Sequence, residues 1–315
     1  MNLKKILEFN FFVIFVFLVV KDCFPQNSNN SKGTVKDTVL SGVSTHIFTT
    51  VNIEDAKAAL NLLLSEMINS WGRPDVTSSP KTYENIEKIK KDININRLDI
   101  IAMTTSEYFI LRDQTRLPPF LAYKSDNITV EKILLVTRTD SKINSVKDLK
   151  KKKVTVFSYL DDEFNLPTLW YKTIVLKNNE NYKNDYAPFL DEVNKSSRAI
   201  SDVFFKKSDA VVVSESEFNI SKELNPQIGN QLKIIDSSKP LLYGIICYTD
   251  RLKTHKNIEM EEIISNFCSM HKSKIGKHFL QMFKITQFIP YKEEYLTNTE
   301  ELYKEFLELS KRKKK

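Results

Sequence analysis

The sequence predicts an α/β protein of two lobes, with mostly parallel sheets and one antiparallel strand that crosses between the lobes. Segments of strand character alternate with helical patterns along the chain, which is typical of parallel sheets. RLDIIA (97–102) and SDAVVV (208–213) each run from a polar turn into a continuous apolar strand, as strands buried on both faces require. The alternation of strands and helices runs twice, with a break near 138–142 and a return near 240–244. We expect the chain to cross from one lobe to the other at these two places, and two crossings of this kind form a hinge.

The first half of the chain predicts strands and helices in turn. The apolar segment VLSGVS at 39–44 predicts a short buried strand. Apolar residues then recur at three- and four-residue spacing over 53–69, which predicts a helix that Trp71–Pro74 ends. The further elements expected here are a helix over 83–91 and strands over 98–103, 117–123 and 133–137.

The second half continues the alternation. A short helix at 145–149 precedes a strand over 153–157, and the loop 158–167 leads into a helix over 168–176. An amphipathic segment at 196–206 precedes the strand that ends SDAVVV. The remaining elements expected are strands over 232–235 and 241–248, followed by helices over 260–270, 274–283 and 300–310.

The first 25 residues have the layout of a secretory signal peptide, although no cleavage site is clearly marked. A cationic pair at 4–5 precedes an apolar run of about a dozen residues, Phe9–Val20, and polar sequence follows. This run is shorter than the roughly 20 residues that a membrane-spanning helix needs. Cys23 follows two charged residues, so lipid anchoring is not expected. We therefore expect export to the periplasm or cell surface, with an uncleaved N-terminal anchor as the alternative.

The formal net charge of +7 does not indicate a nucleic-acid-binding protein. The basic tail 311–315 carries five positive charges, and the signal segment adds a net one more, which leaves the body nearly balanced. The body has no stripe of Lys and Arg interleaved with aromatic residues, the pattern typical of nucleic-acid binders. A nucleic-acid partner is therefore not expected.

The sequence also lacks the common motifs of enzymes and metal sites. It contains no nucleophile elbow, phosphate-binding loop, dinucleotide fingerprint or metal box. Its four histidines are scattered, and its six glycines leave little material for phosphate loops. We expect no catalysis, no cofactor and no metal. Cys247 and Cys268 could form a disulfide in an oxidising compartment, with two free thiols as the alternative.

Four segments, in a fixed order, carry a resemblance to a known family. They are VLSGVSTHIFTTVNIEDAKAAL (39–60), RLDIIAMTTSEYFILRD (97–113), ILLVTRTDSKINSVKDLKKKKVTVF (133–157) and VFFKKSDAVVVSE (203–215). The third is the most specific, because an apolar strand, Arg-x-Asp-Ser, Ser-x-x-Asp-Leu-Lys and a second strand follow one another. Together the four resemble the phosphate/phosphite/phosphonate family of ABC-transporter substrate-binding proteins over nearly all of 38–295.

The resemblance implies the type II periplasmic binding protein fold. It implies a linker at 26–37, lobe 1 at 38–137 plus 243–310, and lobe 2 at 138–242. It also implies a monomer that captures a small polar ligand, phosphonate- or phosphate-like, in an interlobe cleft for an ABC-transporter permease. The alternative is a ligand-sensing periplasmic module that passes its occupancy to a separate membrane sensor.

Ligands of open α/β sheets lie beyond the carboxyl ends of the strands, so the loops after Ser44, Met103, Phe157 and Val213 are expected to face the cleft. Hydroxyl and backbone N–H groups at a helix start suit an anion, although helix capping alone would also explain them. The resemblance implies further ligand contacts. These are an aromatic residue at the start of the 83–91 helix, serines before the helix 199–206, and an acidic residue that accepts hydrogen bonds from an ammonium group. The candidates are Thr45, Tyr83, Thr104, Thr105, Tyr108, Ser158, Tyr159, Ser196, Ser197 and Glu215.

The loop 158–165 departs from the family pattern. Where phosphonate binders typically have a stretch rich in Ser, Thr and Gly, this chain has SYLDDEFN, with no glycine and three acidic residues, Asp161, Asp162 and Glu163. A carboxylate in a desolvated anion site is strongly unfavourable. Either this loop points away from the ligand, or the ligand is neutral, zwitterionic or cationic. The residues leave both alternatives open.

Overall fold

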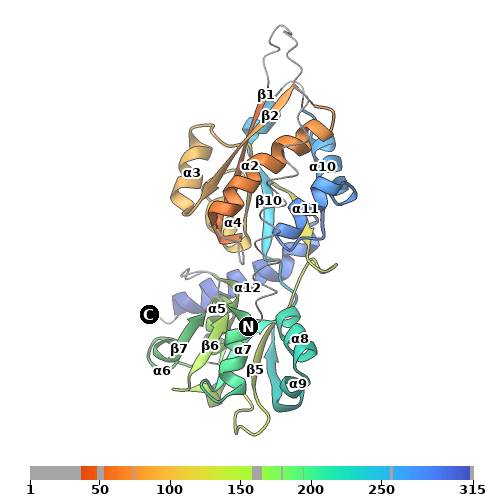
Figure 1. Ribbon diagram of the computed structural model, residues 1–315. Helices are drawn as coiled ribbons and strands as arrows, with labels where there is room; N and C mark the ends of the chain where they lie inside the picture. The colour runs from red at the N-terminus through yellow and green to blue at the C-terminus, as the bar shows by residue number, and fades with distance from the viewer. Residues whose placement is uncertain are drawn as a thin grey trace. The chain divides into compact units, whose positions relative to one another are not determined.

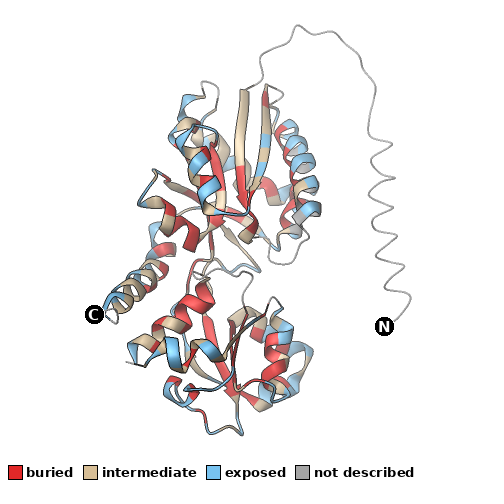
Figure 2. Ribbon diagram, turned by 90° about the vertical axis from the view of Figure 1, so that its left-hand side faces the viewer, coloured by how far each residue is buried: buried red, intermediate tan, exposed pale blue. Residues whose placement is uncertain are grey.

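The computed structural model describes residues 37–47, 53–73, 75–157, 165–178, 180–193, 195–255 and 258–312. Residues Lys36–Lys315 form one compact unit, which contains two β-sheets and the helices that cover them (Figure 1). Buried residues concentrate in the strands and on the helix faces turned toward them (Figure 2). No helix in the described ranges is long and apolar enough to cross a membrane.

The first sheet has six strands in the order β11-β4-β10-β3-β1-β2. The strands β1, β2 and β3 are parallel, and β10 and β11 run antiparallel to their neighbours. Gly42 in β1 leaves room for the core, because a Cβ there would lie 2.8 Å from the ring of Tyr83. The strands are β1 (Asp37–Ser44), β2 (Val76–Tyr83), β3 (Ile100–Thr104), β4 (Pro119–Lys124), β10 (Gly244–Tyr248) and β11 (Gln287–Pro290).

The second sheet has five strands in the order β7-β6-β8-β5-β9. The strands β6, β7 and β8 are parallel, and β5 runs antiparallel to both of its neighbours. All five residues of β8 are buried, as expected of the VVV segment. The strands are β5 (Ile133–Arg138), β6 (Val154–Phe157), β7 (Leu190–Val193), β8 (Ala210–Ser214) and β9 (Leu232–Ser237).

Helices connect these strands and cover the sheets. The α-helices are α2 (Ile53–Ser70), α3 (Ile86–Asn94), α4 (Thr105–Arg112), α5 (Leu166–Lys177), α6 (Tyr182–Asp185), α7 (Ser196–Phe204), α8 (Glu215–Leu224), α9 (Pro226–Gln231), α10 (Met260–Ser269), α11 (Lys274–Met282) and α12 (Glu293–Arg312). The 3-10 turns are η1 (Thr45–Ile47), η2 (Val146–Leu149), η3 (Ala187–Phe189), η4 (Asp250–Thr254) and η5 (Met270–Lys272).

The chain crosses between the sheets twice through extended segments. It leaves the first sheet after β4 and enters the second with β5, then returns after β9 and enters the first with β10. The two crossing segments pair with each other: Glu131 N–H donates to Leu241 O at 2.9 Å, and Leu241 N–H donates to Glu131 O at 2.8 Å. The predicted α/β architecture is confirmed; each sheet has an antiparallel strand that follows a crossing, and β11 adds a third.

The C-terminal helix α12 contributes to the cores of both sheets. Leu296 belongs to the apolar cluster under β3 and β10, and Leu302 belongs to the cluster under β5, β6 and β8. Between them, the hydroxyl of Thr299 accepts a hydrogen bond of 2.8 Å from Leu242 N–H in the return crossing. The lobe boundaries implied by the resemblance remain a prediction, because α12 contacts both halves.

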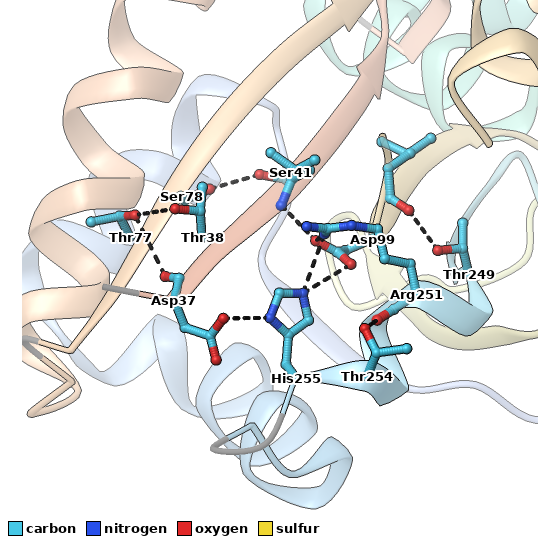
Figure 3. A network of polar contacts seen from close by, with 12 residues as sticks. Asp37, Thr38, Ser41, Thr77, Ser78, Asp99, Thr249, Arg251, Thr254 and His255 are labelled. Atoms are coloured by element: carbon cyan, nitrogen blue, oxygen red, sulfur yellow. Dashed lines mark hydrogen bonds and ion pairs between the residues drawn. The ribbon is translucent and has the colours of Figure 1, made fainter. Parts of the chain in front are cut away.

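A polar network fixes the amino ends of β1 and β3 (Figure 3). The carboxylate of Asp99, fully buried, accepts from Leu40 N–H at 2.7 Å and contacts Arg251. His255 lies between two carboxylates, with Nε2 3.1 Å from Asp99 and Nδ1 2.8 Å from Asp37. The Asp of the RLDII segment therefore joins β1 and β3 to the turn that follows β10.

Three expected element boundaries are wrong. Tyr83 is the last residue of β2 and does not begin a helix; α3 begins at Ile86. The strand VTSSPKTY is polar and contains Pro80, a composition that suits only an edge strand, and β2 lies at the edge of its sheet. Ser196 is the first residue of α7 and does not precede it, and α12 begins at Glu293, before the expected start near 300. The short strands β7 and β11 were not expected.

Candidate ligand-binding site

A cavity of about 230 Å³ is lined by residues from both sheets and from the crossing segments. Most of its polar side chains come from the carboxyl ends of strands, where open α/β sheets place their ligands. The lining residues are His46, Ile47, Thr104, Ser106, Tyr123, Ser125, Asp126, Ile128, Thr129, Glu131, Phe157, Asn165, Leu166, Pro167, Ser214, Ser216, Glu217, Tyr243, Phe283, Lys284 and Ile285.

The corner between β3 and α4 forms one wall of the cavity. Thr104 is the N-cap of α4, and Glu107 completes a capping box with it. The Thr104 hydroxyl accepts from Glu107 N–H at 3.2 Å, and Glu107 Oε2 accepts from Thr104 N–H at 2.9 Å. This reciprocal pair fixes the turn, so that Thr104 and Ser106 line the cavity.

Glu107 is a fully buried carboxylate behind this wall. Its Oε1 accepts from the Ser44 hydroxyl at 2.7 Å and lies 2.9 Å from His46 Nδ1. Burial by itself would raise the pKa of Glu107, but the contacts with His46, Ser44 and Thr104 hold this pKa below its ordinary value. The group is therefore a carboxylate at neutral pH, and it joins the ends of β1 and β3.

The corner between β8 and α8 repeats this local structure in the second sheet. Ser214 is the N-cap of α8 with φ −70° and ψ 154°, and Thr104 has φ −68° and ψ 154°. The Ser214 hydroxyl accepts from Glu217 N–H at 3.4 Å, and Glu217 Oε2 accepts from the Ser196 hydroxyl at 2.5 Å. The segments TTSE and SESE thus place a hydroxyl, a serine and a glutamate at equivalent positions of two helix starts.

The first crossing segment closes the cavity between these corners. The carboxylate of Glu131 accepts from Ser216 N–H at 2.7 Å, so a crossing residue caps α8. Burial and the negative charge of Glu131 raise the pKa of Tyr123 to about 12, which keeps its phenol neutral. Gly244 in β10 makes room for this ring, since a Cβ there would lie 2.8 Å from Tyr123 Cε1.

The start of α5 contributes the last part of the wall, through Asn165, Leu166 and Pro167. Asn165 is the N-cap of α5, and Pro167 occupies the first turn, where its missing N–H removes one potential donor to a ligand. The candidates Ser158 and Tyr159, and the acidic residues Asp161, Asp162 and Glu163, lie outside the described residues.

The candidates between residues 45 and 108 fall in different places. Thr104 lines the cavity, and Thr45 is buried next to the lining residue His46. The Thr105 hydroxyl donates to Leu242 O at 2.6 Å and is fully buried. Tyr108 belongs to the core cluster, and fully buried Tyr83 donates to Asp92 at 2.8 Å. Neither tyrosine is among the lining residues, and the ligand contacts of all five remain predictions.

The candidates Ser196, Ser197 and Glu215 lie around the α8 corner. Ser196 bonds to the lining residue Glu217, Ser197 is exposed, and the Glu215 backbone N–H donates to Lys132 O at 2.9 Å. None of these three side chains lines the cavity. The roles of these residues in ligand binding also remain predictions.

Several lining residues were not among the candidates, above all His46, Glu131, Ser216 and Glu217. The spacing Ser/Thr-x-x-Glu, present at both 104–107 and 214–217, is a sequence signal for a capped helix start and could have identified Glu217. No local pattern identifies Glu131, because its place in the site depends on the pairing of two crossings that are distant in sequence.

The described ranges hold no group of three or more His, Cys, Asp or Glu residues that could bind a metal ion. Cys247 and Cys268 are both free thiols, of which Cys247 is fully buried. Burial raises the pKa of each thiol, which makes the reactive thiolate less available. Neither cysteine lines the cavity, whose polar groups are hydroxyls, carboxylates, the amide of Asn165, the imidazole of His46 and the ammonium group of Lys284.

Comparisons with known proteins identify the family. The family described as the phosphonate ABC transporter's periplasmic substrate-binding protein matches residues 47–296. No curated protein sequence matches the chain. A binding protein component of an ABC phosphonate transporter from Pseudomonas aeruginosa is 14% identical with a TM-score of 0.58, covering 87% of this chain and 88% of its own.

Two further solved structures have similar scores. A protein from Xanthomonas citri bound to ATP is 12% identical with a TM-score of 0.61, covering 88% of this chain and 99% of its own. PhnD1 from Prochlorococcus marinus in complex with methylphosphonate is 16% identical with a TM-score of 0.57, covering 85% and 97%. These likenesses confirm the expected type II periplasmic binding protein fold. Because the family match spans most of the sequence, the chain belongs to the periplasmic substrate-binding proteins of phosphonate ABC transporters.

Proposed function

We propose that the chain is the exported binding component of an ABC transporter, and that it captures a small polar solute in the cavity and releases it unchanged to a permease. The family supports the transport role, and the signal-like N-terminus supports export. A volume of about 230 Å³ suits a small solute.

One observation carries this proposal: equivalent corners of two different sheets line the same cavity. Thr104 and Ser106 come from the first sheet, and Ser214 and Ser216 come from the second. A solute that contacts both corners favours the conformation in which both reach it, because a ligand shifts an equilibrium by its differential affinity for the two states. Occupancy thereby becomes a change of shape that a permease can recognise.

Among the candidates, we assign the direct contact to Thr104. We assign a positioning role to Ser196, which holds Glu217, and we keep Thr45, Ser158, Tyr159, Ser197 and Glu215 as contacts to be tested. Thr105, Tyr83 and Tyr108 then act through packing and hydrogen bonds behind the wall.

The test is a thermal-shift screen of the purified protein against phosphate, phosphonates, amino acids, polyamines and thiamine-like cations. A ligand at about 100 times its Kd stabilises the folded state by about 2.7 kcal/mol, which raises the melting temperature measurably. Titration calorimetry then compares Ser216→Ala, which changes the lining, with Ser197→Ala, which changes an exposed serine near the same corner. Weaker binding in the Ser216 variant alone supports the proposal; turnover of a solute, or equal binding by both variants, contradicts it.

A further inference from the structure

We propose that three lysine-rich turns at one end of the second sheet form a surface that binds anionic lipid membranes, and that the exposed ring of Phe205 enters the lipid head-group layer. The turns are 138–142, 147–153 and 205–209, and we call them together the basic end. This inference goes beyond the proposed function, because no residue of the basic end lines the cavity.

The three turns lie side by side because they flank neighbouring strands. The carboxyl end of β5 and the amino ends of β6 and β8 meet at this edge of the sheet. Asp209 N–H donates to Lys153 O at 2.8 Å, and the Asp209 carboxylate accepts from Lys153 N–H at 2.9 Å. Lys206 Nζ lies 3.1 Å from the carboxylate of Asp140. The turns are therefore parts of one surface.

This surface concentrates positive charge. The three turns contain eight lysines and Arg138 against three aspartates, which gives a net charge of +6, although the body of the chain is nearly balanced. Neighbouring elements add three carboxylates that pair with these lysines, and the net charge with them is still +3; they are Asp185, Asp191 and Asp202. A surface with such an excess of one sign attracts partners of the opposite charge.

All eight lysines are exposed, and half of them form no ion pair with a carboxylate in the described parts of the chain. Positive charges that lie close together without partners repel one another, which opposes folding. The lysines of this second kind are Lys142, Lys147, Lys151 and Lys152.

The backbone of two of these turns is also unfavourable for lysine. Lys151 has φ 57° and Lys206 has φ 62°, in the left-handed region that glycine adopts without steric cost. Residues held in such conformations concentrate at functional sites. Lysine at both positions therefore points to a function of the charge itself.

Phe205 provides an independent observation in the same place. This large apolar side chain is 66% exposed in the turn between α7 and β8. Its ring packs edge-on against the partly buried ring of Phe204, with centroids 5.1 Å apart, and Arg138 donates to the carbonyl oxygen of Phe204. An exposed aromatic ring is thus held directly before Lys206 and Lys207 in the chain.

This combination fits a membrane with anionic lipids. Lysines near such a membrane are attracted by its negative surface potential, and an apolar side chain that enters the head-group layer adds hydrophobic stabilisation. Eight of the nine cations are lysines, whose compact charge needs no fixed partner geometry, whereas recognition of phosphates and nucleic acids favours the planar fork of arginine. The composition therefore favours a diffuse anionic surface over a single phosphate site or a nucleic acid.

The basic end and the cavity lie at opposite ends of β8. Ser214 lines the cavity at the carboxyl end of this strand, and Asp209 directly precedes its amino end. Solute capture therefore does not depend on contact with the membrane. We expect the contact to keep the exported protein close to the membrane, which raises its effective concentration around a permease.

Vesicle flotation tests this inference. The protein used is the compact unit Lys36–Lys315, so that the apolar run near the N-terminus does not contribute to binding. The vesicles contain phosphatidylcholine alone, or phosphatidylcholine with an equal amount of phosphatidylglycerol. We expect binding to the anionic vesicles only, and we expect it to be lost at about 1 M salt, where charges are screened beyond roughly 3 Å.

The double variant Lys151→Gln with Lys152→Gln removes two charges of the basic end. Its matched control is Lys88→Gln with Lys91→Gln, which removes two exposed lysines of α3. We expect the first variant to weaken vesicle binding about 30-fold, since each lysine near an anionic surface contributes roughly fivefold, and the control to leave it unchanged. Unfolding temperatures show whether each variant folds, and Lys142→Gln with Lys147→Gln replaces a first variant that does not.

Phe205→Ala separates the aromatic contribution from the charge. We expect it to weaken binding about tenfold without changing the salt dependence, because it removes apolar contact and no charge. Leu62→Ala is the control, since Leu62 is an exposed apolar residue of α2, at 48%, and should have no effect.

Equal vesicle binding by the two double lysine variants overturns the basic end as the contact surface. Tighter binding to a DNA fragment or to polyphosphate than to anionic vesicles overturns the membrane as its partner, as does full binding by Phe205→Ala. The thermal-shift screen tests the proposed function separately. A protein that binds anionic vesicles and no solute contradicts only the proposed function, and one that binds a solute and no vesicles contradicts only this inference.

Discussion

His46 Nδ1 lies 2.9 Å from Glu107 Oε1, and Glu107 Oε2 accepts hydrogen bonds from the backbone and the hydroxyl of Thr104. The same carboxylate accepts from Ser44 at the end of β1. One buried group thus joins the turn after β1 to the helix start after β3. Because these contacts need the carboxylate form of Glu107, the relative position of the two turns depends on its ionisation. Both turns line the cavity.

This dependence predicts how stability varies at acid pH. The folded-state pKa of Glu107 lies below its ordinary value of 4.5, so its contribution is complete above that value and is lost as the pH falls through the lower folded-state pKa. We expect the free energy of unfolding to fall as the pH is lowered below about 4.5, and this fall to be smaller in Glu107→Gln. Urea unfolding at a series of pH values measures it. The exposed control Glu294→Gln should retain the full pH dependence, and equal curves for all three proteins would contradict the prediction.

Replacing Gly244 should disturb the aromatic part of the cavity. In Gly244→Ala the new Cβ would lie 2.8 Å from Cε1 and Oη of Tyr123, so the ring has to move. We expect weaker solute binding, measured by calorimetry with the best compound of the thermal-shift screen. Gly229→Ala is the control, because its Cβ would meet only ordinary contacts with Lys222 at 3.5 Å or more. Unchanged affinity in Gly244→Ala would show that the ring of Tyr123 does not contact the solute.

The strands that the sequence predicts well are those whose burial is visible in the residues themselves. The run Ile100–Thr104 and the run Ala210–Ser214 are apolar throughout or nearly so, and both are central strands. The polar strand β2 has no such signal, since its pairing with β1 provides the stability that its own composition lacks. For this reason the sequence pattern wrongly places Tyr83 in the helix that begins three residues later, at Ile86.

The site was predictable to the extent that it depends on strand ends. Thr104 follows β3 and lines the cavity, as the rule for open α/β sheets predicts. The contribution of Glu131 follows from the pairing of the two crossings, and that of Tyr123 from the space left by Gly244. Such tertiary relationships leave no periodicity in the sequence, so they could be recognised only in the folded chain.

The buried carboxylate of Asp99 should stabilise the first sheet through its contacts with Arg251 and His255. In Asp99→Asn, Arg251 and His255 lose their shared buried carboxylate, so we expect the free energy of unfolding to fall by about 3 kcal/mol, the low end for a broken buried ion pair. Asp113→Asn is the matched control. Its carboxylate is 78% exposed and lies 3.8 Å from Arg112, so a loss below about 1 kcal/mol is expected. Urea unfolding measures both, and similar losses in the two variants would contradict the role given to the Asp99 network.

The hydrogen bond between Thr299 and Leu242 should contribute to the stability of the return crossing. Its fully buried hydroxyl is the acceptor for Leu242 N–H at 2.8 Å, and Leu242 is buried as well. Thr299→Val keeps the shape of the side chain but leaves this N–H without an acceptor, which costs about 1 to 3 kcal/mol of stability. Thr299→Ser retains the hydroxyl and serves as the control. Hydrogen exchange measured by NMR should show the Leu242 amide exchanging faster in the valine variant than in the serine variant. Equal exchange rates would mean that the crossing is held by the Glu131–Leu241 pairing without the help of α12.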